Sequence, residues 1–496
     1  MRKTFITLLT LAASLTAGAS DADSTLAEHL GMWQSVRSEA ILNPALHATA
    51  YNSSFSQLYM QAAIRRQSEA FEQEKGDGFF HPELRVESFL RLSERTAVWG
   101  EAGYMNGRQR NIRWNSTSDY DLLKPYILAD TLGGDTRLER YLFSGGYATR
   151  LDNWLLGAEM LFRADQEYRD TDPRMRGIVN DLTLRLGAAY NTAGYHWALA
   201  FEGNIYKQTN SVVFYRELGV IPEYQMTGLG TEYARFSGDK RTLYYKGGSK
   251  RLLIDVEPES GAAGPYAHLS LEEACHKRVI AELNSMPLTD MYRDQVAATL
   301  GWRGHSWAVF TQFSYADRNG EEHIAGTSAA TYFPIIGKRT MYKNHLMDAS
   351  LSATYGQKAA LDWRLTGRGG YLQNHERYVY PERRMEYSRY YGTLSGELFY
   401  GTGRWSFMGN LSAAYYANAD SKLSLPYSDM QPAFIDKADR QFEFAKADYT
   451  EVKVLLRADC KMKKAYSLFA SLGGGFIDCS VGERQLDASL SLGITF

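Results

Sequence analysis

The chain lacks several features that mark common protein classes. Its 496 residues include only three cysteines and twelve prolines, and the net charge is −2. Beyond the N-terminal leader there is no run of about 18 apolar residues, so no membrane-spanning helix is expected. A net charge this close to zero gives no reason to expect a nucleic-acid partner.

The three cysteines do not suggest a disulfide or a metal site. Cys275, Cys460 and Cys479 include no CxxC pair and no zinc-type spacing. Cys460 is expected near the tight turn that ends one strand and Cys479 at the far end of the next strand, on the order of 45 Å apart. We therefore expect no disulfide between them.

Known catalytic motifs are also missing. The sequence contains no phosphate loop, HExxH motif, calcium loop or nucleophile elbow. Three histidines, His323, His345 and His375, lie in expected loops with acidic residues nearby, which leaves a barrel hydrolase as a lesser alternative. We therefore expect no enzymatic activity, no cofactor and no bound metal.

Aromatic residues and glycine are abundant. The chain has 34 Tyr, 22 Phe, 9 Trp and 43 Gly, while its mean hydropathy is −0.38. A soluble protein of this length would need more Leu, Ile and Val for its core. A membrane β-barrel needs apolar residues only on its outer face, with aromatic residues at the two interfaces. The composition therefore favours a barrel.

The last eleven residues alternate strictly between apolar and polar or small side chains. This period of two is typical of a β-strand with one apolar face. The ending resembles the terminal strand of Gram-negative outer-membrane barrels, whose final Phe is read by the barrel-assembly machinery. The resemblance implies that outer-membrane lipid and this machinery are partners of the chain. The residues of this assembly signal are Leu490, Leu492, Ile494 and Phe496.

From residue 55 onward the chain reads as alternating segments of about 10 to 15 residues, the length of a tilted membrane strand. Short turns and long polar connections alternate between these segments. The prediction is an all-β, antiparallel, up-and-down transmembrane barrel of about 16 strands, within a range of 14 to 18, with long extracellular loops. Whether segment 209–288 adds a further hairpin, Leu243–Val256 with Tyr266–Cys275, stays open.

The chain divides into three expected parts. Residues 1–19 have a basic start, a short apolar stretch and small residues at a cleavage site, as in a secretory signal peptide. Residues 20–54 do not alternate and are predicted to lie in the periplasm or in the lumen as a plug. Residues 55–496 form the barrel. Within the second part, Asn43, Pro44 and Ala45 resemble the N-terminal hatch of FadL-type transporters.

Alternation assigns a set of charged residues of both signs to the inside of the barrel. Such a mixture is compatible with ion pairs between neighbouring strands or with a lined substrate path, since a selective pore tends to carry one sign. The expected lumen residues are Arg85, Glu87, Arg91, Glu101, Glu159, Arg163, Arg185, Glu202, Arg364, Arg368, Glu397, Arg457 and Asp459.

The long connection after residue 209 is rich in aromatic residues and arginine. This composition is typical of contact surfaces, although such loops can equally pack on each other and cap the barrel. The candidate partner-contact residues are Phe214, Tyr215, Arg216, Tyr233, Arg235 and Phe236.

These loop residues, with Asp172-Pro173-Arg174 before a strand and the terminal Phe, resemble an uncharacterised Gram-negative outer-membrane barrel family. Its members are commonly encoded beside TonB-dependent transporters. The resemblance implies an outer-membrane location and a role as an accessory to uptake, and it supplies no catalytic residue. We therefore expect outer-membrane transport, as a passive channel or as an accessory to a TonB-dependent system. The alternative is a non-enzymatic scaffold whose loops engage another outer-membrane protein, such as a TonB-dependent transporter or a surface lipoprotein.

Overall fold

The structure is a computed structural model of the whole chain. It describes residues 21–30, 42–215, 223–236, 242–259, 262–327, 332–358, 361–426, 432–463 and 466–496. The expected signal peptide, residues 1–19, lies outside the described residues. No helix in the described part of the chain is long and apolar enough to cross a membrane.

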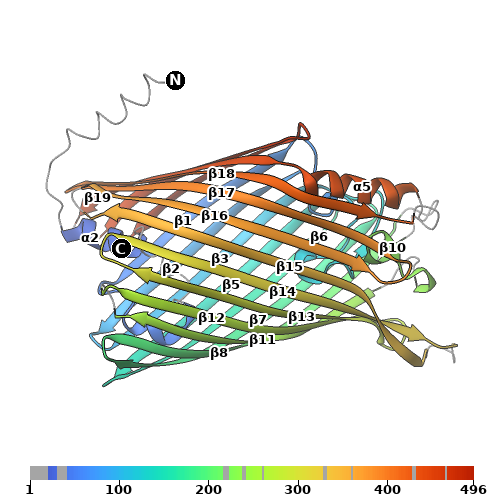
Figure 1. Cartoon of the computed structure of the whole chain (residues 1–496), viewed down its shortest axis with the longest axis horizontal. Coiled ribbons are helices and arrows are strands. Elements are labelled where there is room, and N and C mark those ends of the chain that lie inside the picture. The colour runs from blue at the N-terminus through green and yellow to red at the C-terminus, as the bar shows by residue number, and fades with distance from the viewer. Residues whose placement is uncertain are drawn as a thin grey trace.

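Eighteen antiparallel strands form one closed barrel (Figure 1). Each strand pairs with its neighbour in the chain, and the last strand pairs with the first, for example Leu490 opposite Ala62. The wall is therefore an up-and-down barrel without a free edge. Its strands are β1 (Phe55–Gln67), β2 (Gly78–Ser93), β3 (Thr96–Ile112), β5 (Gly134–Leu151), β6 (Trp154–Tyr168), β7 (Arg174–Thr192), β8 (Tyr195–Val213), β11 (Thr242–Pro258), β12 (Gly264–Ile280), β13 (Met286–Arg303), β14 (Trp307–Ala325), β15 (Ile335–Gln357), β16 (Leu361–Tyr378), β17 (Arg383–Thr402), β18 (Trp405–Ser424), β19 (Tyr449–Lys463), β20 (Tyr466–Cys479) and β21 (Arg484–Thr495).

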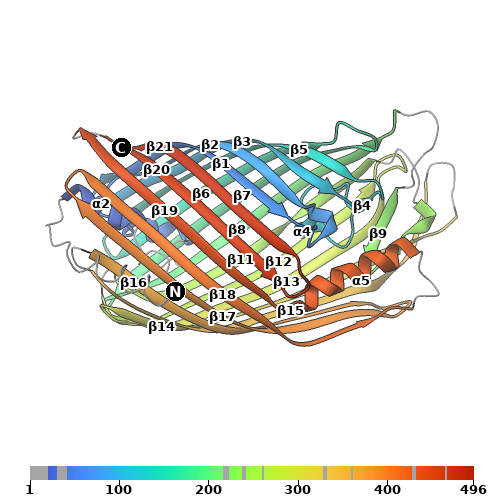
Figure 2. The ribbon, with the colours of Figure 1, turned by 90° about the horizontal axis from the view of Figure 1, so that it is seen from above.

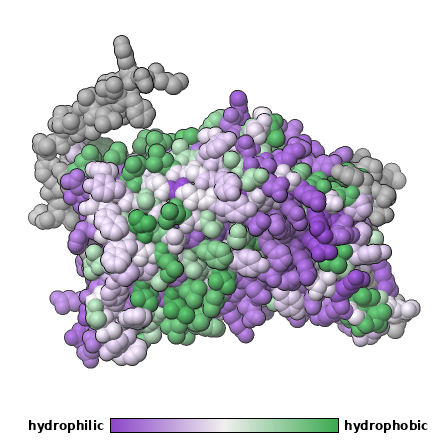
Figure 3. All heavy atoms as spheres, viewed as in Figure 1, coloured by the Kyte–Doolittle hydropathy of each residue, from purple (hydrophilic) through white to green (hydrophobic). Residues whose placement is uncertain are grey.

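The apolar residues of the alternating pattern lie on the outer face of the wall. On β8, Trp197, Leu199 and Phe201 are exposed, whereas the residues between them are buried. Figure 3 shows apolar residues gathered over the half of one face that lies nearer the C terminus, and hydrophilic residues over much of the other half. Several strands are longer than a membrane requires, so the barrel extends beyond its apolar belt on one side.

The two ends of the barrel differ. Short turns and the C terminus lie at one end, which we call the turn end, and the longer connections lie at the other, the loop end (Figure 1). Positive φ angles at Asp152, Ala193, Gly194 and Gly403 let the hairpins close within two residues. The expected alternation of short turns and long connections is confirmed.

The strand count corrects the sequence prediction. About 16 strands were expected, but β11 and β12 are both part of the wall and bring the number to 18. They are the hairpin left open in segment 209–288. Lys246, Gly247, Gly248 and Lys250 interrupt the apolar pattern of β11, which is why alternation alone did not place this strand in the barrel.

Three segments fold together at the loop end and form what we call the cap: residues 113–133, residues 223–236 and helix α5. β9 pairs with β4 on one edge and with β10 on the other. Figure 2 shows β4, β9 and α5 together at the loop end, away from the C terminus. The elements of the cap are α4 (Tyr120–Leu123), β4 (Leu128–Ala129), β9 (Tyr224–Gly228), β10 (Thr231–Glu232), η5 (Ala234–Phe236) and α5 (Pro432–Lys446).

The N-terminal part is small. Helix α2 (Asp21–Leu30) lies at the turn end, and Glu28 accepts hydrogen bonds from the backbone of Asn52 and Ser53. The short helix η3 (Pro44–Ala48) packs on the inner face of β5, β6 and β7. A plug that fills the barrel from this side is not seen in the part of the chain that the structure describes. A second short helix, η4 (Gln73–Lys75), follows β1.

Candidate functional site

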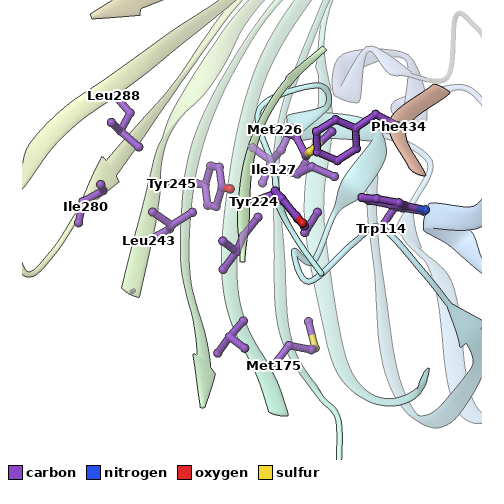
Figure 4. Packing of buried hydrophobic residues seen from close by; sticks show 14 of the residues in the cluster. Trp114, Ile127, Met175, Tyr224, Met226, Leu243, Tyr245, Ile280, Leu288 and Phe434 are labelled. Atoms are coloured by element: carbon purple, nitrogen blue, oxygen red, sulfur yellow. The ribbon is translucent and has the colours of Figure 1, made fainter. Parts of the chain in front are cut away.

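The cap has its own hydrophobic core inside the mouth of the barrel. The rings of Trp114 and Tyr224 lie 5.3 Å and 5.1 Å from that of Phe434, centroid to centroid (Figure 4). Each large side chain buried in this way contributes about 1.5–3 kcal/mol, so the cap is firmly docked. The wall contributes the inward-facing residues Met175, Val179, Tyr206, Val212, Leu243, Tyr245, Ile280 and Leu288.

Buried ionic contacts fix the connection 113–133 to the wall. Arg169, directly after β6, lies 2.9 Å from Asp130, and neither side chain is exposed. Arg163 makes two hydrogen bonds to Asp119, at 2.9 and 2.7 Å. Arg278 of β12 is fully buried and donates to the backbone carbonyl of Met226 at 3.0 Å, which ties the second cap segment to the wall.

Two large cavities lie between the cap and the wall in the part of the chain that the structure describes. The first has a volume of 790 Å³ and is bounded by α4, α5 and strands β13 to β20. The second has a volume of 740 Å³ and lies towards β1–β7. Both are lined by Tyr120 and Asp121 of α4. Burial and the carboxylates of Glu74 and Glu72 raise the pKa of the Tyr120 hydroxyl well above its ordinary value, so this group remains a neutral donor between the two spaces.

A row of tyrosines runs along the inner wall beside the first cavity. Tyr391, Tyr416 and Tyr449 lie directly opposite one another on β17, β18 and β19, and the last two line the cavity. Their rings stack, with centroids 5.5 and 4.3 Å apart. Arg389 lies over the rings of both Tyr387 and Tyr449, at 5.2 Å from each. This surface can stack against a flat or ring-shaped solute.

Charged and amide groups face the first cavity as well. Arg293, Arg318, Asn344, Asn374 and Glu376 all line it, from strands β13 to β16. An apolar platform with a few converging polar groups is the usual composition of a site for a small organic molecule. The arrangement can therefore bind a polar solute that carries a ring.

The inner wall on the other side is closed by a continuous chain of ion pairs. From Glu159 to Glu272 each member lies opposite its neighbour on the adjacent strand, as in the 2.8 Å pair between Glu159 and Arg185. Arg293 reaches Glu272 from a diagonal position, two residues away from Gln295, the residue opposite Glu272. Trp99 donates to Glu159 at 2.8 Å and extends the chain to β3. The chain runs from β6 to β13 through Glu159, Arg185, Glu202, Arg251, Glu272 and Arg293.

The other sequence-predicted lumen residues also have partners within the wall or cap. Arg85 pairs with Glu87 at 3.0 Å and with Glu101. Arg91 donates to the backbone of Ala48 and so contacts the N-terminal segment. The remaining pairs are Arg163 with Asp165 and Asp181, Arg364 with Glu397, Arg368 with Asp348, and Arg457 with Asp459.

Alternation therefore found the charged residues of the inner face. It also puts Tyr391, Tyr416 and Tyr449 on that face, but charge alone was used to select candidates and these tyrosines were missed. The cap was missed for a different reason: it depends on contacts between segments far apart in the chain, such as Trp114 with Phe434.

Asn43, Pro44 and Ala45 are held tightly against the inner wall near the turn end. The Asn43 side chain accepts a hydrogen bond from the Ala45 amide at 3.1 Å and donates to Asp255 at 3.4 Å. A Cβ on Gly157 would lie 2.3 Å from the carbonyl carbon of Pro44, so only glycine fits at that position. The turn makes specific contacts with the inner wall, and its likeness to the FadL-type hatch stays a prediction.

The candidate partner-contact residues have different environments. Phe214 packs against the cap core. Tyr233 and Arg235 donate to backbone carbonyls of His323 and Ala325 at the end of β14. Tyr215 is 68% exposed and lies under Arg174, whose guanidinium is 4.2 Å from the ring centre.

Two other candidates cannot be placed. Arg216 and the side chain of Phe236 lie outside the described residues. Of the four candidates that the structure describes, Phe214, Tyr233 and Arg235 make contacts in the cap or between the cap and β14. The Tyr215 side chain is instead exposed at the loop end.

The remaining predicted features lie in the wall. Leu490, Leu492 and Phe496 are exposed on the outer face, and Ile494 alternates with buried Thr495. All three cysteines are free. Within the described ranges, no group of three or more His, Cys, Asp and Glu residues could hold a metal ion.

A comparison with known protein families shows to which family the chain belongs. A family described as "Family of unknown function (DUF6850)" matches residues 44–496, from η3 to the last residue. The chain belongs to this family. The family match covers the whole barrel and the cap of this DUF6850 chain, and no curated protein sequence matches the chain.

Solved structures of other barrels are similar to the DUF6850 chain only distantly. A ferric enterobactin receptor (PfeA) mutant from Pseudomonas aeruginosa is 9% identical, with a TM-score of 0.38 over 90% of this chain and 80% of that one. The siderophore receptor PirA from Acinetobacter baumannii is 8% identical, with a TM-score of 0.40 over 89% and 81%. The ferric citrate transporter FecA is 12% identical, with a TM-score of 0.39 over 88% and 78%. At this level of likeness nothing about binding or mechanism follows for the DUF6850 chain.

Proposed function

We propose that this outer-membrane barrel carries a small polar solute across the outer membrane through its lumen, with the cap as the gate on the outer side. The turn end then faces the periplasm, because short turns lie on that side of outer-membrane barrels. The C terminus and helix α2 are on the same side. The loop end and the cap face the medium from which a solute would enter.

The observation that carries this proposal is the 790 Å³ cavity between the cap and the tyrosine row. Its volume is within the range of sites for small molecules, about 300–1,000 Å³. A barrel whose only role was to hold loops in place would not need an aromatic platform and converging polar groups in its interior.

Solute entry into liposomes tests the proposal. The purified full chain is reconstituted, and the rate of swelling is measured with neutral sugars of increasing mass. We expect Tyr416→Ala and Tyr449→Ala to change the rate at least several-fold for solutes that fit the cavity, because each variant removes a stacking surface. Tyr390→Ala is the matched control, since Tyr390 is on the lipid side of the same strand as Tyr391 and is 61% exposed. Swelling no faster than that of empty liposomes for all solutes would contradict the proposal.

A second role is favoured by one observation at the loop end. The exposed Tyr215 ring and the Arg174 guanidinium stacked on it form a surface of the kind that anchors protein interfaces. If the loops engage another outer-membrane protein, Tyr215→Ala combined with Arg174→Ala should remove that protein from a mild-detergent pull-down. Unchanged recovery of every partner would exclude this surface as the contact.

A further inference from the structure

The outer wall carries three lysines in a row. Lys207 on β8 lies directly opposite Lys246 on β11, and Lys246 lies directly opposite Lys277 on β12. All three are exposed. Their chain neighbours Tyr206, Tyr245 and Arg278 are buried against the cap, so the lysines point outward, away from the lumen.

On β8 the row stands at the edge of the apolar belt, whereas on β11 to β13 the exposed charges of Lys250, Glu273 and Asp294 lie nearer its middle. Lys207 follows Trp197 by ten residues on the same face of β8, which at about 3.3 Å per residue and a tilt of about 40° corresponds to roughly 25 Å along the barrel axis. That is the usual height of the apolar band. On the neighbouring side, Tyr292 lies opposite Cys275, two residues before Lys277. The lysines therefore stand just beyond the aromatic girdle of the loop end, at the level of lipid headgroups.

The wall does not neutralise this row. Like charges directly opposite each other on antiparallel strands are destabilising, and no carboxylate in the described part of the chain lies within 4.0 Å of the three ammonium groups. Asp290 lies opposite Lys277, but it is buried and binds Lys338 at 2.8 Å and His323 at 3.2 Å. Glu273 lies opposite Lys250, and Lys250 is four residues nearer the middle of the belt than Lys246.

From this geometry we infer that Lys207, Lys246 and Lys277 form a binding site for the phosphate groups of an anionic lipid in the outer leaflet. The inference rests on the outer-membrane location and does not depend on transport through the lumen. The three lysines are on adjacent strands, and the Cβ atoms of directly opposite residues are about 5 Å apart. Their ammonium groups therefore match a headgroup that carries more than one phosphate. The apolar side chains below them, including exposed Ile205, Ile254 and Leu271, contact the acyl chains of the same molecule.

Native mass spectrometry of the full chain in non-ionic detergent tests the site. Diphosphoryl lipid A is titrated, and the fraction of protein carrying one lipid is measured. The triple variant Lys207→Gln, Lys246→Gln and Lys277→Gln should bind roughly 100-fold more weakly, since each lysine at a membrane surface is worth about 1 kcal/mol. The corresponding triple Arg variant should keep the affinity, and monophosphoryl lipid A should bind the original chain more weakly.

The double variant Lys250→Gln and Lys343→Gln removes two other exposed outward lysines and should bind like the original chain. Melting of each variant, followed by its shift in gel mobility on heating, shows that the barrel is folded. Equal binding of diphosphoryl lipid A by the original chain and the triple Gln variant would overturn the inference. So would an equal loss in the double variant. Neither result bears on swelling of liposomes, so the transport proposal stands or falls separately.

Discussion

At the scale of single residues, two glycines decide where the N-terminal segment lies. A Cβ on Gly157 would meet the Pro44 carbonyl carbon at 2.3 Å, and one on Gly187 would meet the Asn43 side-chain oxygen at 2.1 Å. The atoms of Pro44 that lie nearest to Gly157 are backbone atoms. A larger residue at position 157 therefore cannot be accommodated by rotation of a side chain. The wall of β6 and β7 is thus shaped to receive residues 43–48.

The first prediction follows from this fit. Gly157→Val should displace the segment at a cost of about 1–3 kcal/mol, the usual penalty for overpacking. Hydrogen–deuterium exchange should then be on the order of 10-fold faster for the amides of residues 45–49. Gly392→Val is the control, because nothing lies within 4 Å of the Cβ it would carry. Equal exchange in the two variants would show that the glycine does not hold the segment.

Residue-level reading of the sequence was informative where alternation applies. The charged lumen residues followed from it, because a residue's parity in a strand fixes its side of the wall. The partner of each charge did not follow, since the pairing of Glu202 with both Arg185 and Arg251 requires the register of three strands. Asn43-Pro44-Ala45 was identified as a turn, but its contact with Asp255 joins residues more than two hundred positions apart.

At the scale of elements, the cap is the part that sequence reasoning could not predict. Residues 113–133 contain no strong alternation, and their fold depends on β9 and α5 from distant parts of the chain. The strands, in contrast, were located by a local period of two. β11 and β12 stayed open because charged residues and glycine interrupt the apolar residues on their outward faces, as at Lys246, Gly248 and Glu273.

The second prediction concerns the attachment of the cap. Arg169→Met leaves the Asp130 carboxylate buried without its partner, which typically costs about 3–5 kcal/mol. Amides of residues 113–133 should lose protection against hydrogen exchange, while those of β15–β18 should keep it. Arg137→Met is the matched control: it breaks the 2.9 Å pair with Asp170, in which both side chains are more than half exposed, and such pairs are worth about 0–1 kcal/mol. A cap equally protected in both variants would contradict this account of its attachment.

At the scale of the whole molecule, closure between β1 and β21 makes the barrel. Leu58 to Gln67 pair with residues of β21, and the backbone of Phe496 pairs with that of Ser56. The Phe496 side chain is 61% exposed on the outside and is not needed for that closure. We therefore expect its role to lie in assembly.

The third prediction separates assembly from stability. Phe496→Ala should reduce the amount of folded barrel in the outer membrane several-fold, because the terminal aromatic residue resembles the signal read by the assembly machinery. The same variant, refolded into detergent, should melt close to the original chain. Phe407→Ala removes another exposed outward Phe and should leave the amount in the membrane nearly unchanged. If both variants assemble equally well, Phe496 is not an assembly signal.

The central claim is that a solute path runs through the lumen and is closed by the cap. Single-channel recording in planar bilayers tests it most directly, comparing the full chain with a variant in which residues 114–132 are replaced by a short Gly-Ser linker. Gel mobility before and after heating establishes that the variant barrel is folded. We predict a small or intermittent conductance for the full chain and a stable conductance at least several-fold larger for the folded variant. A folded variant that conducts no better than the full chain would contradict the claim.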